Sequence, residues 1–253
     1  MEKITGLDSV IEKFYDDERC VALRNEFSSR KHVIGIAGNI GVGKSTLAHV
    51  LSSITACPVY QEMDKPNPYL KNFYENPKEW AYASQIFFLE EKAEKMKHVS
   101  ESQSSAIIDR TIYEDVSVFG RAQKEFGYMT DSQWDDYEDK SRELIDSIPY
   151  PDVILYLRGN PSPTLVERIN DRNRPEEMNG STLDVEYLHL LDALYELMVQ
   201  SLRREGKTKV RVVETDYSKE EIRANCKKES VIERVTEKAV EQLYNCFCRN
   251  KQD

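Results

Sequence analysis

Residues 38–45 read GNIGVGKS, the stretch of the chain that is most informative about its fold. It fits the pattern G-x-x-x-x-G-K-[ST], follows the apolar run HVIGIAG (32–38) and precedes the helical pattern TLAHVLSSI (46–54). Glycine tolerates a positive φ and a close backbone approach, so successive N–H groups can face phosphate oxygens at a helix N-terminus. We predict a nucleoside triphosphate site formed by Gly38, Asn39, Gly41, Gly43, Lys44, Ser45 and Thr46.

Two polar side chains of this loop have separate predicted roles. Lys44 is expected to reach the β and γ phosphates, and the hydroxyl of Ser45 is expected to ligate Mg²⁺. ATP and Mg²⁺ are therefore the expected cofactors. The loop alone does not say whether water, a protein, a nucleic acid or a small molecule accepts the phosphoryl group.

Apolar runs of strand length alternate with longer helical patterns along the chain. Their hydrophobicity is continuous rather than alternating, which is typical of strands covered on both faces. Strands joined by helices predict a parallel sheet with right-handed crossovers, in which ligands bind at the carboxyl ends of the strands. We predict a three-layer α/β fold of the P-loop kinase type, with five parallel strands within residues 32–38, 58–62, 105–110, 153–159 and 210–215.

The composition limits the possible partners. The chain has 35 Lys and Arg residues against 45 Asp and Glu residues, and its net charge of −10 argues against a polynucleotide or an anionic membrane as partner. No apolar run reaches the roughly 18 to 20 residues of a membrane helix, and the acidic start of the chain does not read as a targeting peptide. The five unevenly spaced cysteines favour reduced thiols. We expect a cytoplasmic protein.

Charged residues at the ends of the second and third predicted strands favour an acceptor with a hydroxyl group. Glu62 could take the proton from such a hydroxyl during phosphoryl transfer, although taken alone it reads more readily as a surface or capping residue. The segment IIDRTIYED (107–115) places Asp109 near the metal and lets Arg110 offset charge on the reacting oxygens. A simple salt bridge is the alternative for that pair.

The segment RINDRNRPEE (168–177) predicts an arginine-rich lid. Arg168 and Arg172 share a helical face, and Arg174 follows closely. Such a segment next to a phosphate site can close over ATP and neutralise the transferring group. An exposed charged helix is the alternative interpretation.

In these motifs the chain resembles the deoxyribonucleoside kinases, in the branch of deoxyadenosine and deoxyguanosine kinases. The resemblance runs from about residue 32 to 217 and rests on GNIGVGKST, DRTIYED and RINDRNRPEE, in that order. Between the first two lies NPYLKNFYENPKEWAYASQIFFLEEK (67–92). The resemblance implies ATP-dependent phosphorylation of the 5′-hydroxyl of a deoxyribonucleoside, as in nucleotide salvage.

The resemblance also implies a role for each matching residue. Glu62 is the base for the 5′-hydroxyl, and Arg110 lies beside that hydroxyl. The nucleoside itself is assigned to Tyr74 and Glu177 at the sugar 3′-hydroxyl, Gln85 at the base edge, Phe119 stacked on the base, and Lys92 with Asp115 in the positions that tune base choice. Lys92 departs from the arginine more common in the family, and it lacks the planar fork of a guanidinium.

Gln85 and Asp115 favour some bases over others. Gln85 carries a donor and an acceptor and can pair two atoms of adenine, while Asp115 can accept from an exocyclic amino group. Thymine presents the acceptor O4 at that place, which a carboxylate would leave unpaired. Guanine stays possible if Lys92 donates to its O6. We expect deoxyadenosine first, with deoxyguanosine and deoxycytidine as weaker substrates.

Two other functions compete with this one. A nucleoside monophosphate kinase of the thymidylate kinase type would share the phosphate loop and the lid, but its acceptor phosphate needs cationic clamps rather than the base Glu62. A non-catalytic scaffold subunit with a kinase-like fold would not need Lys44, Ser45, Glu62 and Arg110 together.

The ends of the predicted kinase domain (31–253) carry two additions. An N-terminal helical arm (1–30) has an apolar face within residues 8–27 that would be poorly explained in water. Because kinases of the resembled family are commonly dimers, we predict that the arm packs on a neighbouring subunit in a homodimer or higher homo-oligomer. Packing on its own domain is the alternative. Residues 218–230 are highly charged and predict a solvated excursion.

Overall fold

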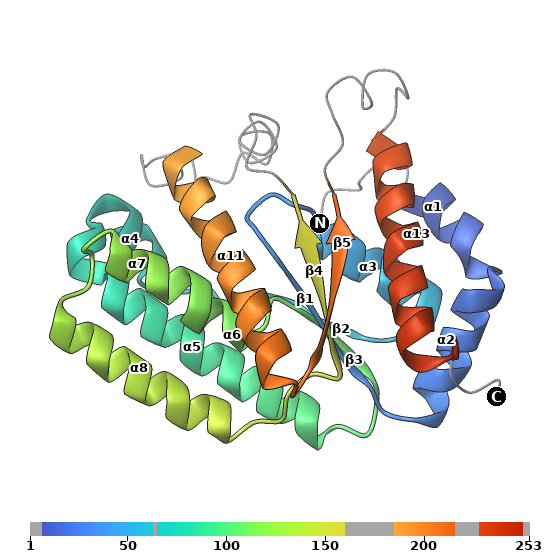
Figure 1. The fold of residues 1–253 in the computed structure, drawn as a ribbon, viewed down its shortest axis with the longest axis horizontal. Helices are drawn as coiled ribbons and strands as arrows, with labels where there is room; N and C mark the ends of the chain where they lie inside the picture. Colours follow the sequence, from blue (N-terminus) through green and yellow to red (C-terminus); the bar gives the residue numbers. More distant parts are fainter. Residues whose placement is uncertain (1–6, 63–64, 160–184, 216–227, 250–253) are drawn as a thin grey trace.

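The computed structural model describes residues 7–62, 65–159, 185–215 and 228–249. At its centre is a five-stranded sheet with the strand order β2-β3-β1-β4-β5 (Figure 1). The strands are β1 (Val33–Gly38), β2 (Val59–Tyr60), β3 (Ala106–Asp109), β4 (Val153–Arg158) and β5 (Lys209–Glu214). All four neighbouring pairs are parallel. The predicted five-stranded parallel sheet is therefore confirmed.

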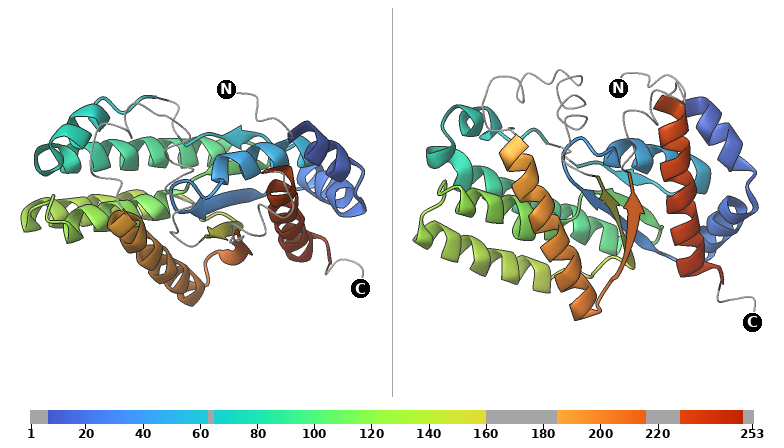
Figure 2. Two further views of the ribbon diagram at one scale, coloured as in Figure 1. Left: turned by 90° about the horizontal axis from the view of Figure 1, so that it is seen from above. Right: turned by 45° about the horizontal axis from the view of Figure 1, so that its top comes forward.

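Helices cover both faces of the sheet, which gives the predicted three layers (Figure 2). One face carries α1 (Leu7–Tyr15), α2 (Glu18–Ser29), α3 (Lys44–Thr55) and α13 (Lys228–Phe247). The other face carries α4 (Leu70–Glu75), α5 (Pro77–Glu101), α6 (Ile112–Glu114), the π-helix η1 (Asp115–Gly120), α7 (Arg121–Glu125), α8 (Asp131–Asp146) and α11 (Val185–Glu205). Within the described ranges, no helix combines the length and the apolar character needed to cross a membrane.

Each face of the sheet builds its own hydrophobic core. Ile34 and Ile36 of β1 are fully buried toward α3 and α13, whereas Ile108 of β3 and Ile154 of β4 belong to the opposite core. Successive residues of a strand point to opposite faces, so continuous apolar runs supply both cores at once.

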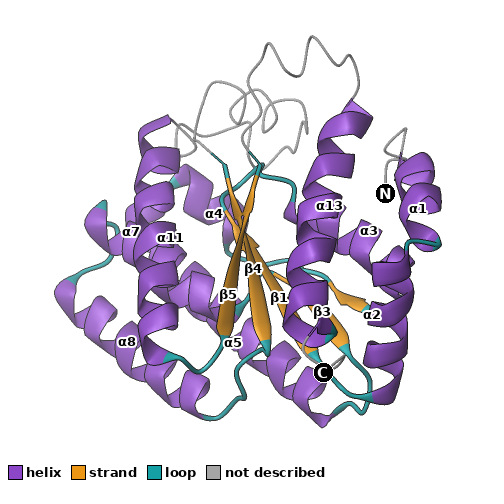
Figure 3. Cartoon of the chain, turned by 45° about the vertical axis from the view of Figure 1, so that its right-hand side comes forward, coloured by secondary structure: helices purple, strands orange, loops and turns teal. Residues whose placement is uncertain are grey.

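The strand order places β1 in the middle of the sheet, between β3 and β4. Because every pair is parallel, the carboxyl ends of the strands meet at one edge (Figure 3). The connection after β1 leads to β2 on one side of the sheet, whereas the connection after β4 leads to β5 on the other side. The chain therefore diverges between β1 and β4, and open α/β folds bind ligands at such a point.

The N-terminal arm packs on the same chain. Helices α1 and α2 contact α3 and α13, and their apolar residues join the core of that face. Arg24 of α2 donates hydrogen bonds to the carbonyl oxygens of Ile54 and Tyr15, both at 2.6 Å. Most of the apolar face that suggested a neighbouring subunit is therefore covered within the chain, whereas Tyr15 and Val21 stay exposed. A role of the arm in assembly stays a prediction.

Removing one core side chain from the arm should measurably destabilise the protein. Leu23 is fully buried, so Leu23→Ala should lower the free energy of unfolding by about 2–4 kcal/mol through lost burial and an unfilled cavity. Urea denaturation followed by circular dichroism measures this change. Val21→Ala on the same helix is the matched control, because Val21 is 38% exposed. Equal effects of the two substitutions would show that the arm does not form part of the core.

Candidate active site

The phosphate loop joins the end of β1 to the start of α3. Gly38, Gly41 and Gly43 all have positive φ angles, of 149°, 82° and 105°. A Cβ atom on Gly38 would lie 2.6 Å from the carbonyl oxygen of Leu157, so that position also requires glycine for space. The backbone thus has the conformation that turns N–H groups toward an anion at the N-terminus of α3.

The polar side chains of the loop face different surroundings. Lys44 is buried, and its Nζ donates to the carbonyl oxygens of Gly38 at 2.8 Å and Asn39 at 2.9 Å. Ser45 is exposed and Thr46 is half-buried. The Asn39 amide donates to the carbonyl oxygen of Leu188 in α11 at 2.9 Å, so this side chain ties the loop to α11.

The pKa of Lys44 is lowered to about 7, first by burial and then by the nearby charge of Arg110. The charges of Glu62, Glu114 and Asp109 act in the opposite direction and limit the shift. A bound triphosphate would place negative charge beside this amine and so favour its protonated form.

Asp109 ends β3 beside the loop, at the position paired with Ile36 of β1. Its side chain is buried, and neither carboxylate oxygen has a hydrogen-bond partner among the described residues. Unpartnered buried carboxylate oxygens need a cation or water, and Mg²⁺ is usually held by one or two carboxylates together with phosphate oxygens and water. The described part of the chain has no group of three His, Cys, Asp or Glu side chains that could hold a metal alone. Asp109 with Ser45 fits the sparser Mg²⁺ arrangement.

Arg110 follows Asp109 in a strained backbone conformation. Its φ is 69°, in the left-handed region that costs a non-glycine residue about 1–2 kcal/mol. Its Nε donates to Glu62 Oε1 at 2.6 Å, and its Nη1 donates to the hydroxyl of Tyr195 at 2.8 Å. The guanidinium carbon lies 4.4 Å from the ring centroid of Phe119. The unusual backbone angle is thus accompanied by contacts that fix the side chain.

Glu62 lies just beyond β2, with its side chain 36% exposed. Burial opposes its ionisation, but the charges of Arg110, Lys92 and Lys44 outweigh that effect and hold the pKa of Glu62 well below its usual range. The carboxylate is therefore ionised at neutral pH and can accept a proton. To take a proton, the carboxylate must use an oxygen that does not accept from Arg110, or its hydrogen bond with Arg110 must weaken.

Two residues of this site were not predicted from the sequence. Glu114 is fully buried and accepts hydrogen bonds from the backbone N–H of Thr111 at 2.7 Å and from the Tyr195 hydroxyl at 2.8 Å. The sequence did hold a signal for Glu114, because TIYE (111–114) has the spacing of a capping box, which the structure forms. Tyr195 had no such signal in the amphipathic pattern of its helix.

Gln85 and Lys92 of α5 and Asp115 of η1 are all buried. Gln85 Oε1 and Asp115 Oδ2 have no hydrogen-bond partner among the described residues. Burial raises the pKa of Asp115 to about 6, although Lys92 and Arg110 act in the opposite direction. Unpartnered buried acceptors of this kind fit a polar ligand with donors.

The sugar-binding and lid predictions are only partly within the described structure. Tyr74 of α4 is half-buried, and it helps burial to raise the pKa of Tyr187 in α11, so the two phenols are near neighbours. Tyr187 in turn accepts a hydrogen bond from Gln123 Nε2 at 3.2 Å. Arg168, Arg172, Arg174, Glu177 and the charged segment 218–227 lie outside the described residues.

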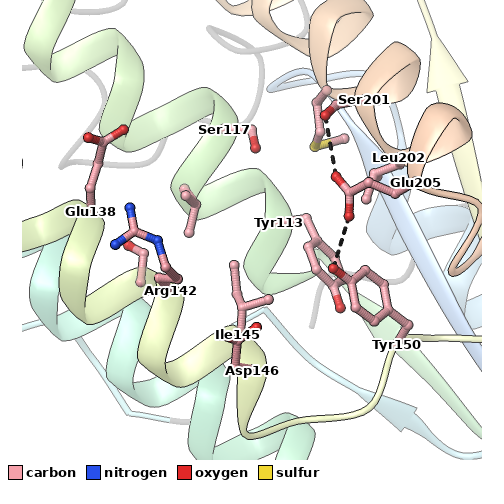
Figure 4. Close-up of a pocket in the computed structure, with 13 residues that line it drawn as sticks. Tyr113, Ser117, Glu138, Arg142, Ile145, Asp146, Tyr150, Ser201, Leu202 and Glu205 are labelled. Carbon is pink, nitrogen blue, oxygen red and sulfur yellow. Dashed lines mark hydrogen bonds between the residues drawn. The ribbon is translucent and has the colours of Figure 1, made fainter.

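A separate pocket of about 270 Å³ lies between η1, α8 and the end of α11 (Figure 4). Glu205 in its wall accepts from the Ser201 hydroxyl at 3.3 Å and from the Tyr150 hydroxyl at 3.1 Å. None of the residues assigned to phosphate, metal or nucleoside lines it. We therefore assign this pocket no part in catalysis.

Comparison with known proteins decides the family. Residues 34–241 match the family described as Deoxynucleoside kinase. The chain belongs to the deoxynucleoside kinase family. It is a kinase that acts on deoxynucleosides, as the resemblance of its motifs implied.

Curated relatives in this family differ in the base that they are named for. The chain is 35% identical over 171 residues to a deoxyadenosine kinase of Dictyostelium discoideum, covering 68% of each chain. It is 33% identical to a deoxyguanosine kinase of Bacillus subtilis, covering 67% of this chain and 79% of the relative. It is 29% identical to a deoxyadenosine/deoxycytidine kinase of the same organism, covering 76% and 88%. Identity at this level leaves the base unresolved.

Solved structures confirm the fold. A deoxyadenosine kinase from M. mycoides with bound dATP superimposes with a TM-score of 0.68, covering 83% of this chain and 98% of that chain. At 23% sequence identity this likeness shows the fold alone.

Proposed function

We propose that this kinase transfers the γ-phosphoryl group of ATP to the 5′-hydroxyl of a deoxyribonucleoside in cytoplasmic nucleotide salvage, with deoxyadenosine preferred. One observation carries the proposal: the carboxylate of Glu62 is hydrogen-bonded to Arg110 at the carboxyl edge of the sheet that also holds the phosphate loop. A carboxylate at that place suits an acceptor that must lose a proton. It does not suit an acceptor phosphate, which argues against a nucleoside monophosphate kinase.

The proposed steps use side chains already placed at this edge. The N–H groups of the loop and Lys44 bind the phosphates of ATP, and Arg110 faces the oxygens that gain charge. Glu62 takes the proton of the 5′-hydroxyl as the new phosphorus–oxygen bond forms and the bond between the γ-phosphorus and the β-phosphate oxygen breaks, which releases ADP. When bound, Mg²⁺ would neutralise phosphate charge, and Asp109 with Ser45 would hold it.

The nucleoside is proposed to lie between α5 and η1. Gln85 and Asp115 supply unpartnered acceptor oxygens, which suit the amino group of adenine, and the amide NH₂ of Gln85 can donate to a neighbouring ring nitrogen. Phe119 would stack on the base, and Tyr74 with Glu177 would bind the 3′-hydroxyl. Lys92 lies close enough to Asp115 for its charge to oppose the rise that burial causes in the pKa of Asp115, so the charges of the two residues interact.

The activity is tested by incubating the purified protein with ATP·Mg²⁺ and each of the four deoxynucleosides. We expect 5′-monophosphates, resolved by chromatography. Phosphorylation of thymidine monophosphate in place of the nucleosides would favour the monophosphate kinase. No product from any of these acceptors would favour the scaffold.

Base preference is expected to depend on Asp115. The kcat/KM for deoxyadenosine should exceed that for thymidine by at least about 10-fold, because thymine O4 would leave a buried carboxylate unpaired. Steady-state kinetics with all four deoxynucleosides at saturating ATP measures this ratio. Asp115→Asn is the matched variant, since its amide can donate to O4 and should shift the ratio toward thymidine. A preference of the parent enzyme for thymidine would contradict the assignment.

We also propose a homodimer or a higher homo-oligomer. The full chain in solution can be tested by light scattering, and a monomeric mass would contradict this proposal.

A further inference from the structure

We propose that Glu114, together with Tyr195, is a positioning residue that holds the guanidinium of Arg110 in register with the phosphate loop. The inference rests on the proposed role of Arg110 beside the reacting oxygens. It concerns a carboxylate outside the predicted site, and it accounts for contacts that helix capping leaves unexplained.

The two oxygens of Glu114 have different surroundings. Oε2 accepts from the backbone N–H of Thr111 at 2.7 Å and from its hydroxyl at 3.4 Å, which completes the capping box of α6. Oε1 faces three other donors: the N–H of Gly38 at 3.3 Å, Nη1 of Arg110 at 3.4 Å and the hydroxyl of Tyr195 at 2.8 Å. Capping uses only one of the two oxygens, so the other is available to act on Arg110.

Tyr195 links the carboxylate to the guanidinium more closely than their direct contact does. Its hydroxyl accepts from Arg110 Nη1 at 2.8 Å and donates to Glu114 Oε1 at 2.8 Å. The ring is fully buried, stacked on Tyr156 at 5.7 Å between centroids and edge-on to Phe119 at 6.4 Å. A side chain held on two sides in this way presents its hydroxyl in one place.

The buried carboxylate of Glu114 contacts both the phosphate loop and the arginine on the acceptor side. Gly38 is the residue where β1 enters the phosphate loop, and Arg110 pairs with Glu62 on the acceptor side. Hydrogen bonds to a buried charged group are stronger than neutral ones, and networks of this kind rigidify their members. Since a misplacement of about 1 Å can lower a rate about 100-fold, fixing Arg110 relative to Gly38 affects turnover directly.

The first test is Glu114→Gln, which keeps the shape of the side chain. Whichever way the amide turns, its NH₂ group faces a donor, either at Thr111 or at Gly38 and Arg110. We expect kcat to fall by about 10- to 100-fold while both KM values change by less than about 3-fold. Tyr195→Phe should lower kcat by about 3- to 10-fold through the same network, and it provides the test if Glu114→Gln does not fold. Tyr156→Phe, which removes a neighbouring hydroxyl, should leave kcat unchanged.

Combining each variant with Arg110→Ala separates positioning from a structural role. If Glu114 acts through Arg110, then Glu114→Gln should change kcat by less than about 2-fold in the Arg110→Ala background. A drop as large as that in the parent would overturn the inference, as would parent-like kcat in both single variants. Unimpaired turnover of Arg110→Ala itself would instead show that the proposed role of Arg110 is wrong.

Discussion

Glu62→Gln should lower kcat by about 100- to 10,000-fold, the scale of a positioned general base. The amide cannot take the proton of a 5′-hydroxyl at any pH used in an assay. It keeps the shape of the carboxylate and can still accept from Arg110 Nε, which lies 2.6 Å from Glu62 Oε1 in the parent. Nucleoside binding should therefore change by less than about 10-fold, whereas turnover collapses. Single-turnover kinetics with ATP and deoxyadenosine, together with equilibrium binding of the nucleoside, measures the two effects separately.

The pairing with Arg110 gives this test a specific alternative. If Glu62 served only to anchor Arg110, the glutamine would retain most of that contact and turnover would stay within a few-fold of the parent. Such a result would remove the base assignment. Glu75→Gln is the control for loss of a carboxylate, because Glu75 of α4 is 64% exposed and should not affect kcat.

The pH dependence should agree with an ionised base. The pKa of Glu62 is held well below its usual range, so the carboxylate is deprotonated throughout the neutral range and loses its charge only under strongly acidic conditions. Protonation of Glu62 in the free enzyme should therefore cause no loss of kcat/KM between pH 8 and about pH 5.

The strands could be predicted because both faces of each central strand are buried. Ile34 and Ile36 face one core, while Ala37 faces the other, so a strand in the middle of this sheet must be apolar at successive positions. Edge strand β2 is only two residues long, and the predicted run 58–62 overstated it. Its outer edge has no partner strand among the described residues, so the run PVYQE is only partly held in the sheet.

The long-range contacts of the site residues could not be predicted from the sequence. The loop motif includes Asn39, but its amide donates to the carbonyl oxygen of Leu188 on α11, a contact between residues 149 positions apart. Likewise, the spacing TIYE identifies Glu114 as a capping residue, yet only the fold brings Tyr195 and Gly38 to its other oxygen. Local patterns predict local bonds, whereas these contacts depend on how β1, α6 and α11 are placed together.

The packing partner of the N-terminal arm could not be predicted either. The sequence shows that the arm has an apolar face, but an amphipathic pattern does not identify the element that covers this face. Phe27 packs edge-on against Phe247 near the other end of the chain, with ring centroids 5.6 Å apart. The arm thus packs on α13 as well as on α3, which no spacing within residues 1–30 could reveal.

Lys44→Ala should lower kcat/KM for ATP by at least about 1,000-fold, because a buried cation is lost from the point where negative charge concentrates during transfer. In the structure this amine is held by the carbonyl oxygens of Gly38 and Asn39, at 2.8 and 2.9 Å. A bound triphosphate would compete for the same amine with charged oxygens, so binding and transfer both lose a strong interaction in the variant. Lys97→Ala, an exposed change on α5, is the control.

The pH profile separates loss of this charge from general damage to the loop. A lysine whose pKa is lowered to about 7 is charged below that pH and neutral above it, so kcat/KM for ATP in the parent should fall as the pH rises beyond about 7. Phosphate charge raises the pKa in the complex, so kcat itself should stay level to higher pH. In Lys44→Ala the alkaline fall of kcat/KM should vanish along with most of the activity. If the variant kept both the parent's kcat/KM and its alkaline fall, Lys44 would not be the cation that binds the transferring phosphate.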